Sequence, residues 1–268
     1  MDRGAVPLNL NSLVLFLYVG ALAFALLFGG FRHRIFFALA TVSAGAGGLL
    51  HAGLLGAYWV QNRIPPAVNL HQLFETTAWA VLVLYFLLLP LTRSRILVFF
   101  VMPLVNLSYL LALLVPDSAV EPKPFYFTPW FAVHIFLLIF GISFFFLSFL
   151  YAAIFIMQDH SLRRRHNPLI LPLPSLEEAE RWCSRLLLCG YPLFSLGMFS
   201  SIAYGVAYGK TENYRPGLLE GASVLAWVVL GIAVYGWLTA KVHPRRRSWL
   251  VVAGAAFSLL ILFGIIWH

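Results

Sequence analysis

The strongest constraint on this chain is a series of eight long apolar segments. A helix that crosses the roughly 30 Å hydrocarbon core of a membrane needs about 20 mostly apolar residues. The 268 residues are 61% hydrophobic and 10% charged, which leaves too little polar surface to cover a soluble globule. We therefore expect an all-α integral membrane protein, a single polytopic domain over residues 1–268. Its eight predicted transmembrane helices, joined mostly by short loops, cover about residues 12–30, 35–59, 72–91, 95–115, 129–157, 187–209, 218–240 and 248–267.

Positive charges predict the orientation of these spans, because short cytoplasmic loops carry an excess of Lys and Arg. Of the 18 Lys and Arg residues, 13 fall in loops on one side: Arg32, Arg34, Arg93, Arg95, Arg163, Arg164, Arg165, Arg181, Arg185, Lys241, Arg245, Arg246 and Arg247. We expect this side to be cytoplasmic and both termini to lie outside. The net charge of +8 then reflects topology. A nucleic-acid surface is disfavoured, because the basic runs are loop-sized and contain no interleaved aromatic residues.

The longest loop, between the fifth and sixth spans, is broken by prolines and then starts a helix. Ser175 followed by Glu178 is a capping-box pattern, which predicts a short amphipathic helix along the cytoplasmic surface. This helix is either a docking face for a partner or a solvated connector. Cys183 and Cys189 follow it, and without a CxxC motif in a reducing compartment we expect ordinary buried thiols.

Four of the eight histidines belong to the outer half of the predicted bundle. His134 lies about five residues into the fifth span, roughly 8 Å below its outer end. His268 ends the eighth span, His51 lies about two turns from the outer end of the second, and His71 begins the third. An ionisable residue within a span is a functional-site hypothesis. The other histidines, His33, His160, His166 and His243, lie among arginines in cytoplasmic loops.

Two chemistries remain open for the outer histidines. Two neutral imidazoles on opposed helices can hold a haem iron axially while apolar side chains receive the macrocycle. Alternatively, each histidine bonds a neighbouring hydroxyl or carbonyl group and only helps to pack the bundle. A zinc site is disfavoured because no carboxylate or thiolate lies at that depth on the same helices.

Several stretches, in this order, resemble those of a known family. They are "PPAVNLHQLFETTAW" at residues 65–79, "VHIFLLIFGISFFFLSFLYAAIFIMQ" at 133–158, "GYPLFSLGMFSSIAYG" at 190–205 and the terminal "FGIIWH". The chain is similar to the cytochrome c assembly membrane proteins of the CcsA/ResC type, and within them to the HemX branch. The resemblance implies a bacterial inner membrane location and a haem b site with His134 and His268 as axial ligands. His51 is the alternative second ligand.

The chain also departs from that family pattern. The tryptophan-rich WGxxWxWD segment of haem-delivery members is missing, since residues 205–220, "GVAYGKTENYRPGLLE", contain no Trp. Gln72 stands where the family has Glu, and His71 where it has Tyr. The expected recipient of any haem is therefore not fixed by the resemblance.

We expect a haem-binding protein of cytochrome c assembly or haem handling, without turnover chemistry. No nucleophile with a base, paired carboxylates or phosphate loop is evident. Its partners would be haem, the lipid bilayer and other assembly proteins. One alternative, from the HemX resemblance, is a membrane regulator or anchor for glutamyl-tRNA reductase. A second is a small-solute transporter, which would require buried charges or broken helices repeated in two halves.

Overall fold

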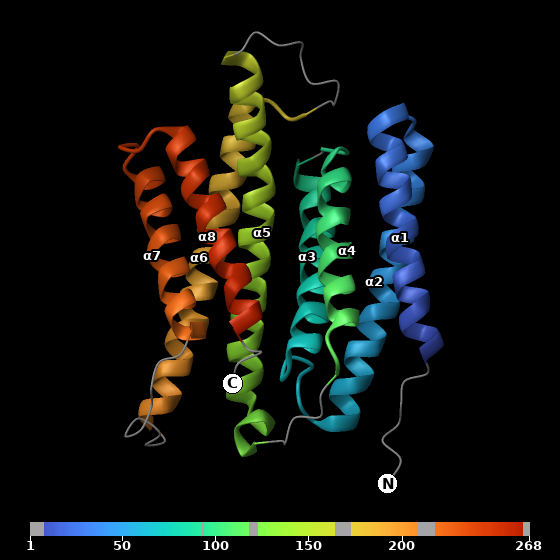
Figure 1. The fold of residues 1–268 in the computed structure, drawn as a ribbon, viewed down its shortest axis with the longest axis vertical. Coiled ribbons are helices and arrows are strands. Elements are labelled where there is room, and N and C mark those ends of the chain that lie inside the picture. The colour runs from blue at the N-terminus through green and yellow to red at the C-terminus, as the bar shows by residue number, and fades with distance from the viewer. Residues whose placement is uncertain (1–7, 93, 118–122, 164–172, 208–217, 265–268) are drawn as a thin grey trace. The chain divides into compact units, whose positions relative to one another are not determined.

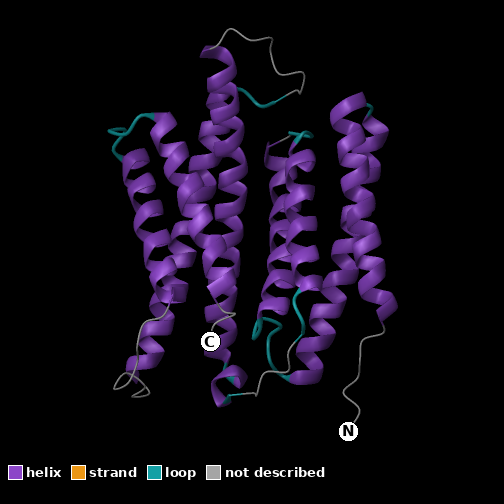
Figure 2. Cartoon of the chain, viewed as in Figure 1, coloured by secondary structure: helices purple, strands orange, loops and turns teal. Residues whose placement is uncertain are grey.

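The computed structural model describes residues 8–92, 94–117, 123–163, 173–207 and 218–264, and these residues are helical apart from short connections (Figures 1 and 2). The helices are α1 (Leu8–Phe31), α2 (Arg34–Asn62), α3 (Leu70–Thr92), α4 (Leu97–Leu114), η1 (Pro124–Phe127), α5 (Pro129–Arg163), α6 (Leu176–Ala207), α7 (Leu218–Leu238) and α8 (Pro244–Gly264). The predicted all-α class is confirmed, and no strand occurs among the described residues.

The helices group into two compact units, and each is described by itself. Unit 1 is Met1–Phe127 and contains α1 to α4 with the short η1 helix. Unit 2 is Thr128–His268 and contains α5 to α8. The expectation of one membrane domain over the whole chain stays a prediction.

The helices α1 to α5 and α7 match the predicted spans to within six residues at each end, whereas α6 begins eleven residues earlier than predicted. Seven of them, α1 to α7, are long and apolar enough to cross a membrane over their described residues. The eighth predicted span corresponds to α8, which begins with Pro244 and three arginines. The last residues of that predicted span, from 265 on, lie outside the described part of the chain. The protein is a multi-pass membrane protein. Its orientation across the membrane stays a prediction.

The sequence predicts a short amphipathic helix that is separate from the sixth span, and this prediction is wrong. It is the first part of α6, which runs without a break from Leu176 into the predicted sixth span. The predicted start is nevertheless correct, because the Glu178 amide donates to Ser175 Oγ at 3.1 Å. No proline or glycine interrupts residues 176–189, so nothing in the backbone ends the helix before it reaches the apolar segment.

Unit 1 is held together by close contacts between small residues and aromatic rings. A Cβ atom at Gly47 of α2 would lie 2.9 Å from the Tyr18 ring of α1, so only glycine allows this approach. At the next residue of α2, the Trp79 indole of α3 donates to the Gly48 carbonyl at 3.2 Å. These contacts fix α2 against both α1 and α3.

Unit 2 is built on a very close packing of α5 against α6. A Cβ atom at Gly141 would lie 2.8 Å from the backbone nitrogen of Phe194. One at Gly190 would lie 2.7 Å from Phe144 Cβ, and one at Gly197 would lie 2.7 Å from Leu138 Cδ2. The three glycines spread along the interface, so the two backbones approach over several turns. Small residues allow such packing in membranes, where apolar side chains gain little by leaving lipid.

We expect Gly141→Ala to destabilise the protein by about 1–3 kcal/mol, because the added methyl group overpacks a contact with the α6 backbone. The measurement is thermal unfolding of the detergent-solubilised protein. Gly53→Ala is the matched control, since a Cβ atom there meets nothing within 4 Å. Because alanine favours a helix over glycine by up to about 1 kcal/mol, the control should be neutral or stabilising. Equal destabilisation by both changes would contradict the packing argument.

Candidate functional site

His134 lies in the second turn of α5 and faces α6. Its Nδ1 atom is 2.8 Å from the Gly197 carbonyl oxygen and 2.9 Å from Ser200 Oγ. Both partners belong to α6, and the close approach at Gly197 brings them within reach. The Trp130 indole, one turn earlier on α5, donates to the Ser200 carbonyl at 3.1 Å. The His134 ring is therefore fixed by two turns of the neighbouring helix.

These contacts determine which ring nitrogen of His134 carries the proton. A carbonyl oxygen can only accept, so Nδ1 donates to Gly197. The Ser200 hydroxyl donates to the same carbonyl at 2.6 Å, so its oxygen is also free to accept from Nδ1. The remaining nitrogen, Nε2, then holds a lone pair. Nε2 makes no hydrogen bond to any described residue. A histidine that bonds a carbonyl through one nitrogen and keeps the other free is in the arrangement that metal-ligating histidines use.

Large apolar side chains on the parts of α5 and α6 that contain His134 and its partners are substantially exposed in the described structure. They are Trp130, Val133, Phe136 and Phe199. Phe199 also contacts the Trp227 ring of α7, whose indole donates to Ser195 Oγ at 2.9 Å. The half-buried imidazole is thus a polar group within a stretch of largely apolar side chains.

The other two predicted ligands are placed differently. His268 lies outside the described residues. His51 belongs to α2 of unit 1, where its Nδ1 is 3.0 Å from the Tyr18 hydroxyl oxygen and its ring contacts Tyr109 edge to face. The side chain is 1% exposed, and its Nε2 is buried without a hydrogen-bond partner. Among the described residues no group of three or more His, Cys, Asp or Glu side chains could hold a metal ion.

His71 lies at the start of α3 in a polar cap of unit 1. Its Nδ1 donates to the carbonyl oxygens of Ala112 at 2.7 Å and Val115 at 3.1 Å, which ties α3 to the end of α4. Its Nε2 lies 3.6 Å from a Glu75 carboxylate oxygen one turn away. Both nitrogens therefore have partners within the unit, so the described contacts assign His71 a structural role.

Gln72, which stands where the resembling family has Glu, belongs to the same polar cap of unit 1. Its backbone amide donates to Asn69 Oδ1 at 2.9 Å, so Asn69 acts as the side-chain cap of α3. The Gln72 side-chain amide donates to the Tyr58 hydroxyl group at 2.9 Å. The neutral amide thereby joins α3 to the end of α2 without adding a charge.

Sequence reasoning selected His134 but missed Gly197 and Ser200. The signal available was the spacing of Gly190 and Gly197 by seven residues, about two turns, which puts both on one helix face. Ser200 lies one turn further on. A serine one turn from an interface glycine is a plausible partner for a histidine on the facing helix, but sequence alone does not identify that helix.

Comparison with known proteins gives the chain its family. The family model described as "Cytochrome C assembly protein" matches residues 67–268, three quarters of the sequence. The chain belongs to this family. It is 27% identical to the protein HemX of Brevibacillus brevis over 205 residues, which cover 74% of this chain and 72% of that protein. It is 28% identical to the inner membrane protein YpjD of Escherichia coli K12 over 137 residues, 51% of each chain.

The matched region includes all of unit 2 and begins just before α3. It therefore contains both His134 and His268, whereas His51 lies before it. The part of the chain that matches the family model therefore includes His134.

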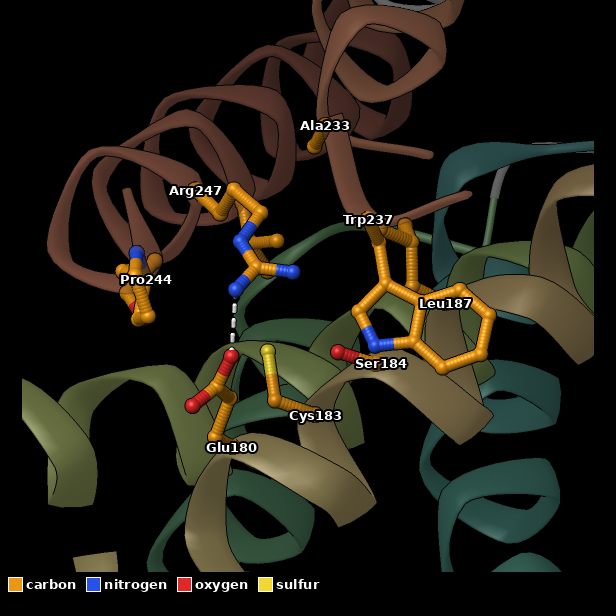
Figure 3. A pocket seen from close by; sticks show the side chains of 10 residues that line it. Glu180, Cys183, Ser184, Leu187, Ala233, Trp237, Pro244 and Arg247 are labelled. Carbon is orange, nitrogen blue, oxygen red and sulfur yellow. Dashed lines mark hydrogen bonds and ion pairs between the residues drawn. The ribbon is translucent and has the colours of Figure 1, made fainter. Parts of the chain in front are cut away.

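The opposite end of unit 2 contains a second group of polar residues (Figure 3). Arg247 of α8 pairs through Nη2 with Glu180 Oε1 of α6, and Trp237 of α7 lies beside them in a small pocket. Arg245 of α8 lies 3.6 Å from the Asp159 carboxylate of α5. These two pairs, which we call the α8 clamp, connect the first turn of α8 to both α5 and α6.

The two cysteines lie near this clamp, and both are free thiols. Cys183 is buried as predicted and lines the pocket. Its carbonyl accepts from Ser148 Oγ of α5 at 2.8 Å. Cys189 is exposed, so its predicted burial is wrong. It lies about two turns further along α6.

We expect Glu180→Leu to destabilise unit 2 by about 1–3 kcal/mol, because it leaves the largely buried Arg247 guanidinium without its carboxylate. Thermal unfolding in detergent measures the loss. The reversed pair Glu180→Arg with Arg247→Glu should recover most of it, since the attraction is restored with opposite signs. Glu177→Leu, at an exposed position one turn earlier, is the control. If the reversed pair unfolds as easily as the single variant, the clamp does not stabilise α8.

Proposed function

We propose that this protein binds haem b on the outer half of unit 2 through His134 and handles haem in cytochrome c assembly. The observation that carries the proposal is the tautomer of His134. Its Nδ1 donates to the α6 backbone at 2.8 Å, and its Nε2 is left with a lone pair and no partner among the described residues. A neutral imidazole of this kind is the usual protein ligand of haem iron.

The surroundings of His134 also fit this group. A haem macrocycle is flat and largely apolar, and the exposed Trp130, which bonds the same Ser200 as His134, offers an aromatic ring close to the imidazole. The hydrogen bond to Gly197 would orient the ring and raise its basicity when bound to iron. His51 fits less well, because its Nε2 is sealed within unit 1 and the packed helices leave no access for a macrocycle.

His268 is the proposed second axial ligand, and it comes from the resemblance rather than from the described residues. His51 is the alternative. The missing tryptophan-rich segment between the sixth and seventh spans argues against direct presentation of haem to a cytochrome. We therefore propose haem binding, storage or transfer, with haem as cargo or resident cofactor and other assembly proteins as partners.

The proposal is tested by replacing the ligands. We expect His134→Ala to remove most bound haem from protein purified in mild detergent, or to convert a low-spin spectrum to a high-spin one. External imidazole should restore the low-spin bands by occupying the vacated position. Ser200→Ala should cause a smaller change, because the Gly197 carbonyl still accepts from Nδ1. His243→Ala, at the far end of unit 2, is the control and should change nothing.

The same spectra decide the second ligand. If His268→Ala leaves the spectrum unchanged and His51→Ala removes the low-spin bands, His51 is the second ligand. If none of the three outer histidines affects bound haem, or if protein from haem-sufficient cells shows no Soret band, the proposed function is wrong.

The orientation that the proposal requires is a separate prediction. We expect reporter fusions after Arg34, Arg95 and Arg247 to be cytoplasmic, because the positive charges cluster there. Fusions near Pro65 and Lys123 should report the outside. A reversed result at either outer position would put His134 on the wrong side of the membrane for the proposed site.

A further inference from the structure

Two arginines of the α8 clamp meet at one carboxylate group. Arg163 Nε of α5 donates to both Asp159 oxygens at 3.0 Å, and Arg245 Nε of α8 lies 3.6 Å from Oδ2 of the same group. Both guanidinium groups therefore border a single oxygen atom, although they come from different helices. The Asp159 side chain is largely buried, whereas those of Arg163 and Arg245 are 57% and 43% exposed.

Asp159 compensates only one of the two positive charges. Arginine stays protonated in proteins, and its guanidinium group carries five N–H donors. Arg163 and Arg245 both approach Asp159 through Nε, and neither side chain makes a further hydrogen bond within the described part of the chain. The pair therefore places one excess positive charge and several unused donors in one half-exposed position.

The first turn of α8 provides no other anion to balance this charge. Arg247 takes up the Glu180 carboxylate, and Arg246 between the two pairs is exposed. The backbone amides of this turn are also occupied, because Arg245 N donates to His243 Nδ1 at 3.3 Å and Arg246 N donates to the His243 carbonyl at 2.9 Å. The donors available to an anion here are thus the arginine side chains, and the helix N-terminus is already capped.

The pair lies where lipid headgroups are expected. Arg163 is the last residue of α5, a helix long and apolar enough to cross a membrane. Arg245 is the second residue of α8 and precedes the apolar part of that helix. Long side chains at such positions reach the headgroup level of the bilayer.

Exposed apolar side chains accompany both arginines. Leu162, next to Arg163, is 69% exposed, and Trp249, one turn after Arg245 on the same face of α8, is 52% exposed. Tryptophan is enriched at membrane–water interfaces. The arginine pair and these neighbours together suit a ligand that joins an anionic group to acyl chains.

The chemistry of the pair selects a phosphate group. A phosphate offers several acceptor oxygens, and each guanidinium group can donate two parallel hydrogen bonds to it. Basic positions between transmembrane helices are sites at which anionic headgroups bind. A cation would be repelled by the excess positive charge, and a soluble anion would make no use of the apolar neighbours.

We propose that Arg163 and Arg245 together bind the phosphate group of an anionic phospholipid at the end of unit 2 where α8 begins. Asp159 is a positioning residue that holds the two guanidinium groups side by side. The bound lipid balances their excess charge and connects the end of α5 to the start of α8. This site is independent of the proposed haem function, because none of its residues takes part in that site, so either proposal can fail without the other.

The test is native mass spectrometry of the full-length protein, freed of lipid in detergent and titrated with phosphatidylglycerol or with phosphatidylcholine of the same acyl chains. We expect phosphatidylglycerol to bind more tightly. Arg163→Gln and Arg245→Gln should each weaken its binding about fivefold, the effect of losing one exposed charged contact. Arg34→Gln, an equal change of charge at an exposed position of α2, is the control and should leave the binding unchanged.

Three outcomes would overturn the proposal. Equal binding of the two lipids would show that the headgroup charge is not recognised, and equal losses in all three variants would show general attraction to positive charge. Inorganic phosphate that displaces phosphatidylglycerol at the same concentration would show a site for a soluble anion. Arg163 and Arg245 are half-exposed and test one site independently, and thermal unfolding without added lipid shows whether each variant is folded.

Discussion

The close approach of the α5 and α6 backbones is the contact on which unit 2 depends. Helices in lipid gain little from the hydrophobic effect when they associate, so van der Waals packing and hydrogen bonds must hold them together. Gly141, Gly190 and Gly197 remove the side chains that would keep the two backbones apart. The remaining helices of the unit add polar contacts at the ends, such as the pairing of Glu180 with Arg247. Close helix packing therefore holds unit 2 together along its length, and ion pairs add to this at one end.

The same approach creates the candidate site. A carbonyl oxygen within a helix is normally committed to its own backbone ladder, yet it keeps a second lone pair. Gly197 exposes that lone pair to His134 because no Cβ atom shields it, and Ser200 donates to the same oxygen at 2.6 Å. The geometry that packs the helices thus also fixes the tautomer of the histidine. A substitution at Gly197 would therefore affect both the stability of unit 2 and the candidate site. A substitution at Ser200 would remove only the second acceptor of His134 Nδ1.

The sequence predicted much of this fold, for identifiable physical reasons. Apolar runs separated by basic loops mark spans with little ambiguity, because lipid tolerates few other backbone arrangements. Ser175 was correctly identified as a helix start, since a capping pattern is local. The continuity of α6 was missed because amphipathic and apolar segments were treated as different elements, although no helix-breaking residue separates them. The tautomer of His134 depends on a contact 63 residues away, which no local pattern reports.

His51 and His134 show that an apolar sequence around a histidine does not determine its chemistry. His134 donates from Nδ1 to the neighbouring helix, and its Nε2 bonds no described residue. His51 pairs its Nδ1 with the Tyr18 hydroxyl group, and its Nε2 is buried within unit 1 without a partner among the described residues. The two differ in the burial of the ring, since His51 is 1% exposed and His134 is half-buried. Access to Nε2 therefore separates the better candidate haem ligand from a histidine that is enclosed by packing.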